Sequence, residues 1–252
     1  MRKTRVVLYL VTALAAGAVL LAPKVGVDAS RGDTTVTSVS VNDGRPIVLG
    51  AAEGAAVPLV LTARDGSGIA SVGPIGVWGP RYGVLGVSPL ECTAEGTATT
   101  CRGTVTVRPT RREIFDDEAG TWFVDLKVRA RDGDRYVNQT AGGFSIKQAT
   151  RLDLGGVTGR AAPGEELKVT GRLERASWQD QRYHAYPGGL VRLQFRAAWS
   201  DVWTTVAEAY AQADGTVGAT VPAAESGAFQ WYYPGDAWVG EALSRVVPVS
   251  VG

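Results

Sequence analysis

The sequence predicts an all-β fold of two tandem immunoglobulin-like β-sandwich domains that follow an N-terminal signal peptide. Apolar and polar residues alternate with a period of two along most of the chain, as in strands with one buried face. The 32 glycines and 12 prolines are a high share that suits many short strands joined by turns. No long window combines a helical period with capping residues. Six or seven short strands in about 100 residues are typical of one sandwich.

Residues 1–29 predict the signal peptide. Arg2, Lys3 and Arg5 precede an uncharged apolar stretch over 6–22. The end of the segment, at 27–29, reads Val-Asp-Ala, with small residues where a signal peptidase cleaves, so we expect cleavage after position 29. The alternative is an uncleaved anchor, because about 17 apolar residues are the lower limit for crossing a bilayer. Either way we expect a secreted or envelope-associated chain, with membrane contact only through this segment.

The first domain is predicted over 30–149. Its clearest strand is 121–131, in which every second side chain from Trp122 to Ala130 is apolar and most of the others are charged. Asp132-Gly133 then signals a tight turn. Weaker alternation, with a short closing run, predicts further strands over 34–41, 57–63, 103–107 and 144–146.

A domain boundary is predicted near 147–150, and the second domain over 150–252. Alternating apolar residues predict its strands around 167–173, 191–195, 203–206, 217–221, 229–233 and 247–251. Pro-Gly, Asp-Gly and Ser-Gly pairs separate these runs. The two halves are alike in strand rhythm but do not align as a repeat, so we expect two sandwiches of different subtype.

The two cysteines, Cys92 and Cys101, predict one disulfide, because an even count in an exported chain favours pairing. In the chain-entropy model a closed loop of about 10 residues contributes roughly 2.5–3 kcal/mol. Two free thiols or a redox pair are the alternatives, and the CxxC spacing that would favour a redox pair is absent.

Several segments resemble a known family. The second half carries L-E-R-A-S-W over 173–178, V-R-L-Q-F-R over 191–196 and F-Q-W-Y-Y-P-G-D over 229–236, and the first half carries V-S-V-N-D-G-R-P-I-V-L-G over 39–50. This pattern resembles a secreted two-domain actinobacterial, Streptomyces-type Ig-like family of unknown function. Some members carry the label "calcium-binding protein". The resemblance implies the tandem fold and export, and it implies nothing about mechanism.

Acidic residues in turn segments are the candidate calcium ligands, because calcium binds about six to eight oxygen atoms. They are Asp65, Asp116, Asp117, Asp132 and Asp134. The alternative is that Asp-Gly pairs serve tight turns and that the acidic run is merely solvated. No EF-hand loop pattern is present in the sequence.

Aromatic residues in or beside predicted loops of the second domain are the candidate carbohydrate-binding or protein-binding residues. They are Trp178, Tyr183, Tyr186, Trp199 and Trp238. The alternative is that they cover the ends of the sandwich or pack between the domains.

The sequence predicts no enzyme, because it contains no catalytic motif such as G-x-S-x-G, S-x-x-K, H-E-x-x-H or a Walker loop. His184 is the single histidine, and we expect it at the surface. Without residues 1–29 the chain has 22 basic and 24 acidic residues, which argues against nucleic acid as a partner. We therefore expect a secreted, non-catalytic protein with a binding or envelope role. Its partner would be a protein or a cell-wall polysaccharide, with no cofactor or with calcium.

Overall fold

The computed structural model describes residues 30–157 and 159–252, so the predicted signal peptide lies outside the described residues. Within these ranges the chain forms twenty β-strands, four short 3-10 helices and no α-helix. The predicted all-β, immunoglobulin-like sandwich class is therefore confirmed. A search of the same residues finds no helix with the length and apolar character needed to span a membrane.

The first half of the described chain contains ten strands. They are β1 (Thr35–Val41), β2 (Ile47–Leu49), β3 (Ala55–Arg64), β4 (Ile69–Val72), β5 (Gly76–Trp78), β6 (Val84–Val87), β7 (Glu91–Glu95), β8 (Ala98–Val107), β9 (Gly120–Ala130) and β10 (Arg135–Gln148). The 3-10 helices are η1 (Asn42–Gly44), η2 (Pro80–Tyr82), η3 (Pro109–Arg111) and η4 (Asp116–Glu118).

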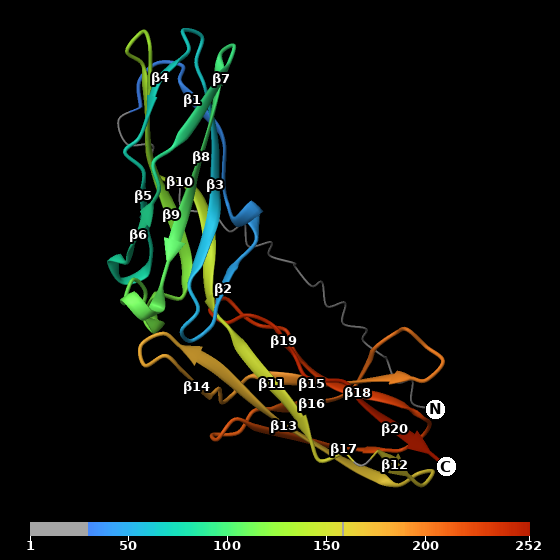
Figure 1. Ribbon diagram of the computed structural model, residues 1–252. Helices are drawn as coiled ribbons and strands as arrows, with labels where there is room; N and C mark the ends of the chain where they lie inside the picture. Colours follow the sequence, from blue (N-terminus) through green and yellow to red (C-terminus); the bar gives the residue numbers. More distant parts are fainter. Residues whose placement is uncertain (1–29, 158) are drawn as a thin grey trace, which may run out of the picture.

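These strands form two layers that are joined along one edge (Figure 1). One layer contains β1, β3, β8 and β7, and the other contains β2, β10, β9, β4 and β5. Strand β6 pairs with β5 of one layer and β8 of the other, so it connects them. The alternation predicted for 121–131 is confirmed, because Trp122, Val124, Leu126, Val128 and Ala130 are all buried between the layers.

The second half also contains ten strands. They are β11 (Thr150–Gly155), β12 (Arg160–Ala161), β13 (Glu166–Ser177), β14 (Arg182–Ala185), β15 (Leu190–Ala197), β16 (Thr204–Tyr210), β17 (Thr216–Pro222), β18 (Gly227–Tyr233), β19 (Ala242–Leu243) and β20 (Val247–Val251).

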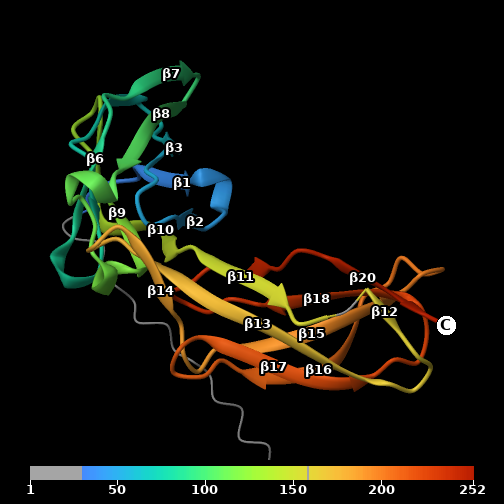
Figure 2. The ribbon, with the colours of Figure 1, turned by 60° about the horizontal axis from the view of Figure 1, so that its bottom comes forward.

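In this half β13 is the central strand of the smaller sheet. Strand β11 lies along one side of it, and β17 and β14 lie in succession along the other. The facing sheet has the order β12-β20-β18-β15-β16 (Figure 2), and β19 pairs with β18. Trp231 of β18 is fully buried between the sheets, and its Nε1 donates to the carbonyl oxygen of Thr170 at 3.0 Å.

The two halves meet where β10 runs into β11 with one residue, Ala149, between them. The Ala149 N–H donates to the Leu49 carbonyl oxygen at 2.7 Å, and the Ala149 carbonyl oxygen accepts from the Ala176 N–H at 2.8 Å. Strand pairing thus changes from the first half to the second at this residue, inside the segment 147–150 where the sequence places the boundary. The halves lie at an angle to each other (Figure 1).

Candidate functional site

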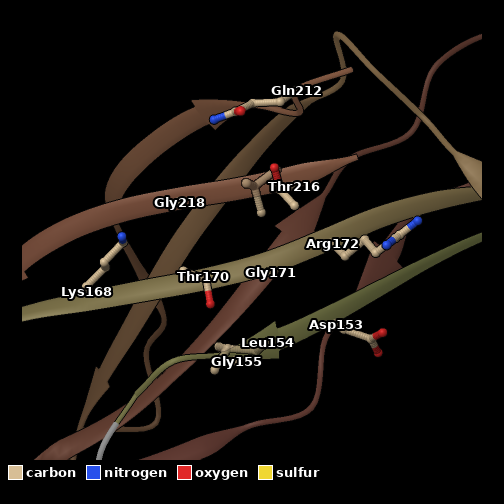
Figure 3. Close-up of a pocket in the computed structure, with 11 residues that line it drawn as sticks. Asp153, Leu154, Gly155, Lys168, Thr170, Gly171, Arg172, Gln212, Thr216 and Gly218 are labelled. Carbon is tan, nitrogen blue, oxygen red and sulfur yellow. The ribbon is translucent and has the colours of Figure 1, made fainter. Parts of the chain in front are cut away.

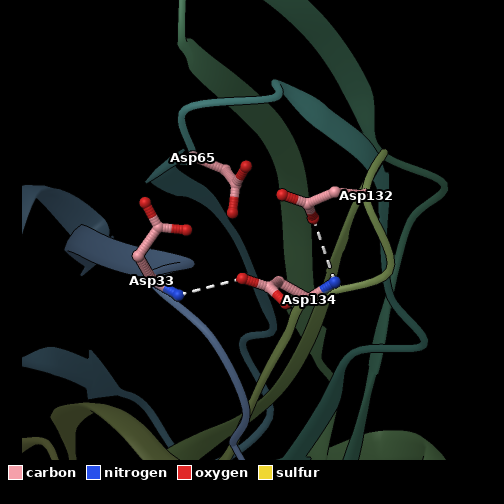
Figure 4. Close-up of side chains that lie close together, drawn as sticks. All are labelled: Asp33, Asp65, Asp132 and Asp134. Carbon is pink, nitrogen blue, oxygen red and sulfur yellow. Dashed lines mark hydrogen bonds between the residues drawn. The ribbon is translucent and has the colours of Figure 1, made fainter.

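Four aspartates converge at one end of the first half (Figure 4). Asp33, Asp65, Asp132 and Asp134 each offer a carboxylate oxygen, and these atoms all lie within 4.8 Å of one another. Asp33 precedes β1, Asp65 follows β3, and the other two lie in the turn between β9 and β10. Three segments that are distant in sequence therefore supply one acidic cluster.

Local hydrogen bonds position three of the four carboxylates, and Asp33 is tied to the cluster through its backbone N–H. Asp65 is 3% exposed, and its Oδ1 accepts from the Ser67 N–H at 2.8 Å and the Ser67 hydroxyl at 2.6 Å, while its Oδ2 accepts from the Thr34 hydroxyl at 2.7 Å. Asp134 Oδ2 accepts from the Asp33 N–H at 3.1 Å. Asp132 Oδ1 accepts from the Asp134 N–H at 3.1 Å.

The electrostatics of the cluster favour a cation. The negative charge of Asp65, together with desolvation and the charges of Asp134 and Asp132, raises the pKa of Asp33 above its ordinary value. Hydrogen bonds from Ser67 and Thr34 lower the pKa of Asp65, so this carboxylate stays ionised. Several carboxylates held this close repel one another. A divalent cation with oxygen ligands would offset the repulsion.

The cluster contains three of the five predicted calcium ligands, Asp65, Asp132 and Asp134. Asp33 was missed, because it meets the others through contacts between distant segments: Thr35 of β1 lies opposite Arg64 of β3, and Arg31 pairs with Arg135 of β10. The partners in these contacts are distant in the sequence, so no local motif predicts that Asp33 joins the cluster.

The prediction that Asp116 and Asp117 are calcium ligands is corrected. Both residues lie in η4, before β9, whereas the aspartate cluster lies beyond the other end of that strand. The Asp116 carboxylate accepts from the Trp178 N–H and from the Ser177 hydroxyl, both at 2.6 Å. Asp117 is exposed and faces Arg81 at 3.6 Å. Asp116 therefore joins the two halves, and Asp117 is a surface residue.

The prediction that Trp178 is a binding aromatic is also corrected, because its side chain is 1% exposed and cannot contact a ligand. It belongs to the hairpin between β13 and β14 in the second half, yet its side chain packs in the core of the first half with residues such as Leu49 and Ile146. Its Nε1 donates to the Leu49 carbonyl oxygen at 3.3 Å. The ring thus fixes the hairpin of one sandwich in the core of the other.

Gln148, the last residue of β10, completes this junction. Its buried side chain donates from Nε2 to the Ala176 carbonyl oxygen at 2.8 Å. Its backbone accepts from the Gly240 N–H and donates to the Trp238 carbonyl oxygen, both at 2.9 Å. Gln148 of the first half is therefore hydrogen-bonded to two segments of the second half, through its side chain at Ala176 and through its backbone at Trp238 and Gly240.

The Asp236 side chain stabilises the loop between β18 and β19, which contains Trp238 and Gly240. Its Oδ1 accepts from the N–H groups of Trp238 and Val239 at 2.7 and 2.9 Å, and its Oδ2 accepts from the hydroxyls of Tyr186 and Tyr233 at 2.8 and 3.1 Å. Burial acts to raise the pKa of Asp236, but these four hydrogen bonds outweigh it and lower the pKa. Tyr186 is therefore a partner of this loop, half-buried against the core of the second half.

The remaining predicted aromatics do not form one face. Tyr183 is half-buried beneath the Arg151 guanidinium, 3.5 Å from the ring centroid. Trp199 and Trp238 are 75% and 58% exposed. Trp199 lies in the loop after β15 and Trp238 lies in the loop after β18, and these antiparallel strands place the two rings at opposite ends of the sandwich. The predicted binding face of five loop aromatics is therefore corrected.

The predicted disulfide between Cys92 and Cys101 is confirmed, and it joins opposite residues of the β7–β8 hairpin. His184 is exposed, as expected, and its Nε2 lies 2.6 Å from Asp180 Oδ2. Within the described chain no hydrogen bond joins this ring to a serine hydroxyl or a cysteine thiol.

No family model and no curated protein matches the chain. The fibronectin(III)-like modules of Clostridium thermocellum CbhA are 12% identical over 85% of this chain and 95% of that chain, with a TM-score of 0.36. A titin I-band fragment, I67–I69, is 10% identical over 86% of this chain and 65% of that chain, at 0.34. A DUF4785 family protein of Legionella pneumophila is 12% identical over 79% and 52%, at 0.44. These likenesses concern the fold alone.

Proposed function

We propose that this protein is a secreted, non-catalytic pair of sandwiches that acts as a rigid structural part of the cell envelope. The junction is the observation that carries the proposal. Two domains on one chain move relative to each other unless the interface between them is large and apolar. Here a tryptophan of the second half is buried in the core of the first, and Asp116 accepts hydrogen bonds from its hairpin.

Small-angle X-ray scattering on the chain 30–252 tests this rigidity. Wild-type protein is expected to fit a single angled arrangement of the halves. Trp178→Ala should broaden the distribution of interatomic distances, because the hairpin then has no side chain in the first core. Trp199→Ala is the matched control, since that ring is exposed and its loss should leave the scattering unchanged. A wild-type profile that needs many arrangements would contradict the proposal.

Export is supported by the signal pattern over residues 1–29, the disulfide and the resemblance to secreted actinobacterial proteins. N-terminal sequencing of the chain recovered outside the expressing cells should begin at Ser30. Recovery only inside the cells, with residues 1–29 intact, would contradict export. Activity on a panel of glycan, peptide and ester substrates, abolished by a single carboxylate substitution, would contradict the non-catalytic assignment.

Calcium binding at Asp33, Asp65, Asp132 and Asp134 is a second proposal, which the acidic cluster favours. We infer that an ion there stabilises the first half by fixing the start of β1 to the β9–β10 turn. Four carboxylates supply part of the six to eight oxygen atoms that calcium takes, and water would supply the rest.

A thermal melt with excess EDTA and then with millimolar calcium tests this site. Ligand at about 100 times its Kd adds about 2.7 kcal/mol, which corresponds to a rise of several degrees in the midpoint. Asp132→Asn and Asp134→Asn should abolish the rise. Asp117→Asn is the matched control, because this exposed aspartate lies outside the cluster. An unchanged wild-type midpoint at millimolar calcium would exclude the site.

A further inference from the structure

Basic side chains gather on the outer face of the first half, across β4, β9 and β10. Arg129 of β9 lies directly opposite Arg135 of β10, and Arg135 lies opposite Arg31 in the segment before β1. Directly opposite residues of antiparallel strands point to the same face, with Cα atoms about 4.5–5.5 Å apart. Three arginines therefore form one row across the sheet. Lys127, two residues before Arg129 on β9, lies on the same outward face, because the alternate residues of β9 are buried between the layers.

This row of arginines is unfavourable for the protein on its own. Like charges directly opposite each other on neighbouring strands destabilise a sheet. All three arginines and Lys127 are exposed, and among residues 30–157 and 159–252 none of them forms an ion pair or a side-chain hydrogen bond. Stability alone therefore does not explain why arginine occupies all three positions.

A pocket of about 430 Å³ lies over this face. Arg129, Arg135 and Lys127 line it, and Ser71 of β4, which lies directly opposite Arg129, adds a hydroxyl group. The other lining residues are glycines and valines, and no carboxylate is among the described residues that form the wall. The pocket therefore presents three cations and one hydroxyl group.

The acidic residues that adjoin this face do not pair with the cations. Asp134 precedes Arg135, and alternation along the strand places their side chains on opposite faces. Asp125 lies two residues before Lys127, but it does not line the pocket, and its buried Oδ1 has no hydrogen-bond partner in the described part of the chain. None of the four residues of the aspartate cluster lines the pocket either. The positive charge is therefore open to a ligand.

The larger hollow on the second half, over β11, β13 and β17, lacks this unpaired charge (Figure 3). Its volume is about 570 Å³, and Asp153 lines it together with Lys168 and Arg172. Arg172 also faces Glu174, with 3.0 Å between the guanidinium nitrogen and the carboxylate oxygen. Its positive charge is balanced locally, so this hollow does not select an anion.

The pocket on the first half fits a phosphate group better than a carboxylate. A guanidinium group donates two parallel hydrogen bonds to a phosphate, and arginine is well suited to recognise phosphate in this way. A phosphate monoester carries a charge of about −1.5 to −2 at neutral pH, so it can pair with several cations at once. A carboxylate carries a single charge and would leave most of the positive charge of the pocket unpaired.

We propose that this pocket binds a phosphate group, which lies between Arg129 and Arg135 and contacts Lys127 and the Ser71 hydroxyl. Arg31 extends the positive surface beyond the pocket for a ligand with a second phosphate group. The site goes beyond the structural role and the calcium site proposed above, because neither the junction nor the aspartate cluster contributes a lining residue. Soluble phosphate compounds and phospholipid headgroups both carry this group, and binding assays distinguish them.

Calorimetric titration of chain 30–252 with sodium pyrophosphate in calcium-free buffer tests the site, with citrate as the carboxylate reference. We expect pyrophosphate to bind more tightly than citrate, and sodium chloride to weaken the binding, because the cations are exposed. Arg129→Gln and Arg135→Gln should each weaken it about tenfold, the loss expected for one charge-assisted contact. Arg102→Gln is the matched control, since this exposed arginine lies on β8 of the other layer.

Thermal melts without ligand separate a loss of binding from a loss of folding. Because Arg129→Gln and Arg135→Gln each remove a contact between like charges, the midpoint of the ligand-free protein should stay equal or rise. A fall of several degrees in both variants would overturn the proposal, because it would show that the two arginines stabilise the fold.

Sedimentation with phosphatidylglycerol vesicles, and with phosphatidylcholine vesicles as the reference, distinguishes the two sources of phosphate. Cosedimentation with phosphatidylglycerol that pyrophosphate displaces and Arg135→Gln weakens would assign the group to a lipid headgroup. Pyrophosphate binding without cosedimentation would assign it to a soluble compound. Equal affinity for citrate, an equal loss in Arg102→Gln, or no binding of either pyrophosphate or phosphatidylglycerol would contradict the phosphate site.

Discussion

At the scale of single residues, the buried ring of Trp178 gives a direct prediction. Trp178→Ala should lower the free energy of unfolding by about 3–5 kcal/mol, the usual cost of truncating a buried aromatic ring. The reason is that the ring leaves a cavity beside Leu49 and Ile146 in the first core. Urea denaturation followed by far-UV circular dichroism measures the change. Trp199→Ala should stay within about 0.5 kcal/mol of wild type. Equal small effects for both tryptophans would show that the ring is not packed in the first core.

The chemical type of a site residue was easier to predict from the sequence than its surroundings. Asp132 and Asp134 were identified as candidate ligands because the local sequence Asp-Gly-Asp predicts their turn. Trp178 was misplaced, because its neighbours Ser177 and Gln179 indicate a loop, and nothing in that loop shows that the core of the other half surrounds it. Such contacts between distant segments cannot be read from one sequence.

Calcium affinity should fall as the pH is lowered from neutral, and the fall should begin above the pH expected for an isolated aspartate. The reason is that the charge of Asp65 raises the pKa of Asp33, so Asp33 is protonated first and competes with the ion. Titrations at a series of pH values measure this dependence. In Asp33→Asn the onset should move to lower pH, and an onset that does not move would contradict the assignment.

At the scale of secondary-structure elements, alternation located most strands but not their partners. The segment 121–131 was predicted almost to its ends, because its buried and exposed faces differ clearly. The β7–β8 hairpin was not predicted as such, since β7 is exposed throughout and shows no apolar period. Strand order and register depend on which faces are buried together, so the meeting of Asp33 with the β9–β10 turn was beyond sequence reasoning.

Replacing both cysteines by serine should destabilise the chain by roughly 2.5–3 kcal/mol or less, the upper value being the loop-entropy estimate for about ten residues. The β7–β8 pairing already holds Cys92 and Cys101 opposite each other, which limits the gain from the bond. Urea denaturation with and without reductant measures it, with the double-serine chain as the reference that reductant should not affect. A larger loss would mean that the hairpin depends on the disulfide to form.

Asp236→Asn should destabilise the 234–241 loop by about 1–3 kcal/mol at neutral pH, because two tyrosine hydroxyls lose their shared acceptor. The folded-state pKa of Asp236 lies below its ordinary value, so its stabilisation is present at neutral pH and is lost as the pH falls through that pKa. The difference between wild type and variant should therefore shrink in acid. Thermal melts between neutral and acidic pH measure it, and a constant difference would contradict this role.

At the scale of the whole molecule, two sandwiches were predictable and their union was not. The spacing of the turns and a boundary near 147–150 could be predicted, because apolar and polar residues alternate separately within each half of the sequence. The angled arrangement follows from Trp178, Gln148 and Asp116, three residues in distant segments whose partners lie across the boundary. The two halves therefore form one body, in which the second half completes the core of the first.

Differential scanning calorimetry of chain 30–252 tests whether the two halves unfold together. Wild type should show one cooperative transition. Trp178→Ala should show two separated transitions, with the first-half transition at the lower temperature because its core has lost the ring. Trp199→Ala should again show one transition. Two independent transitions in wild type, each at the temperature at which the separate chains 30–149 and 150–252 melt, would mean that the halves are not joined through Trp178.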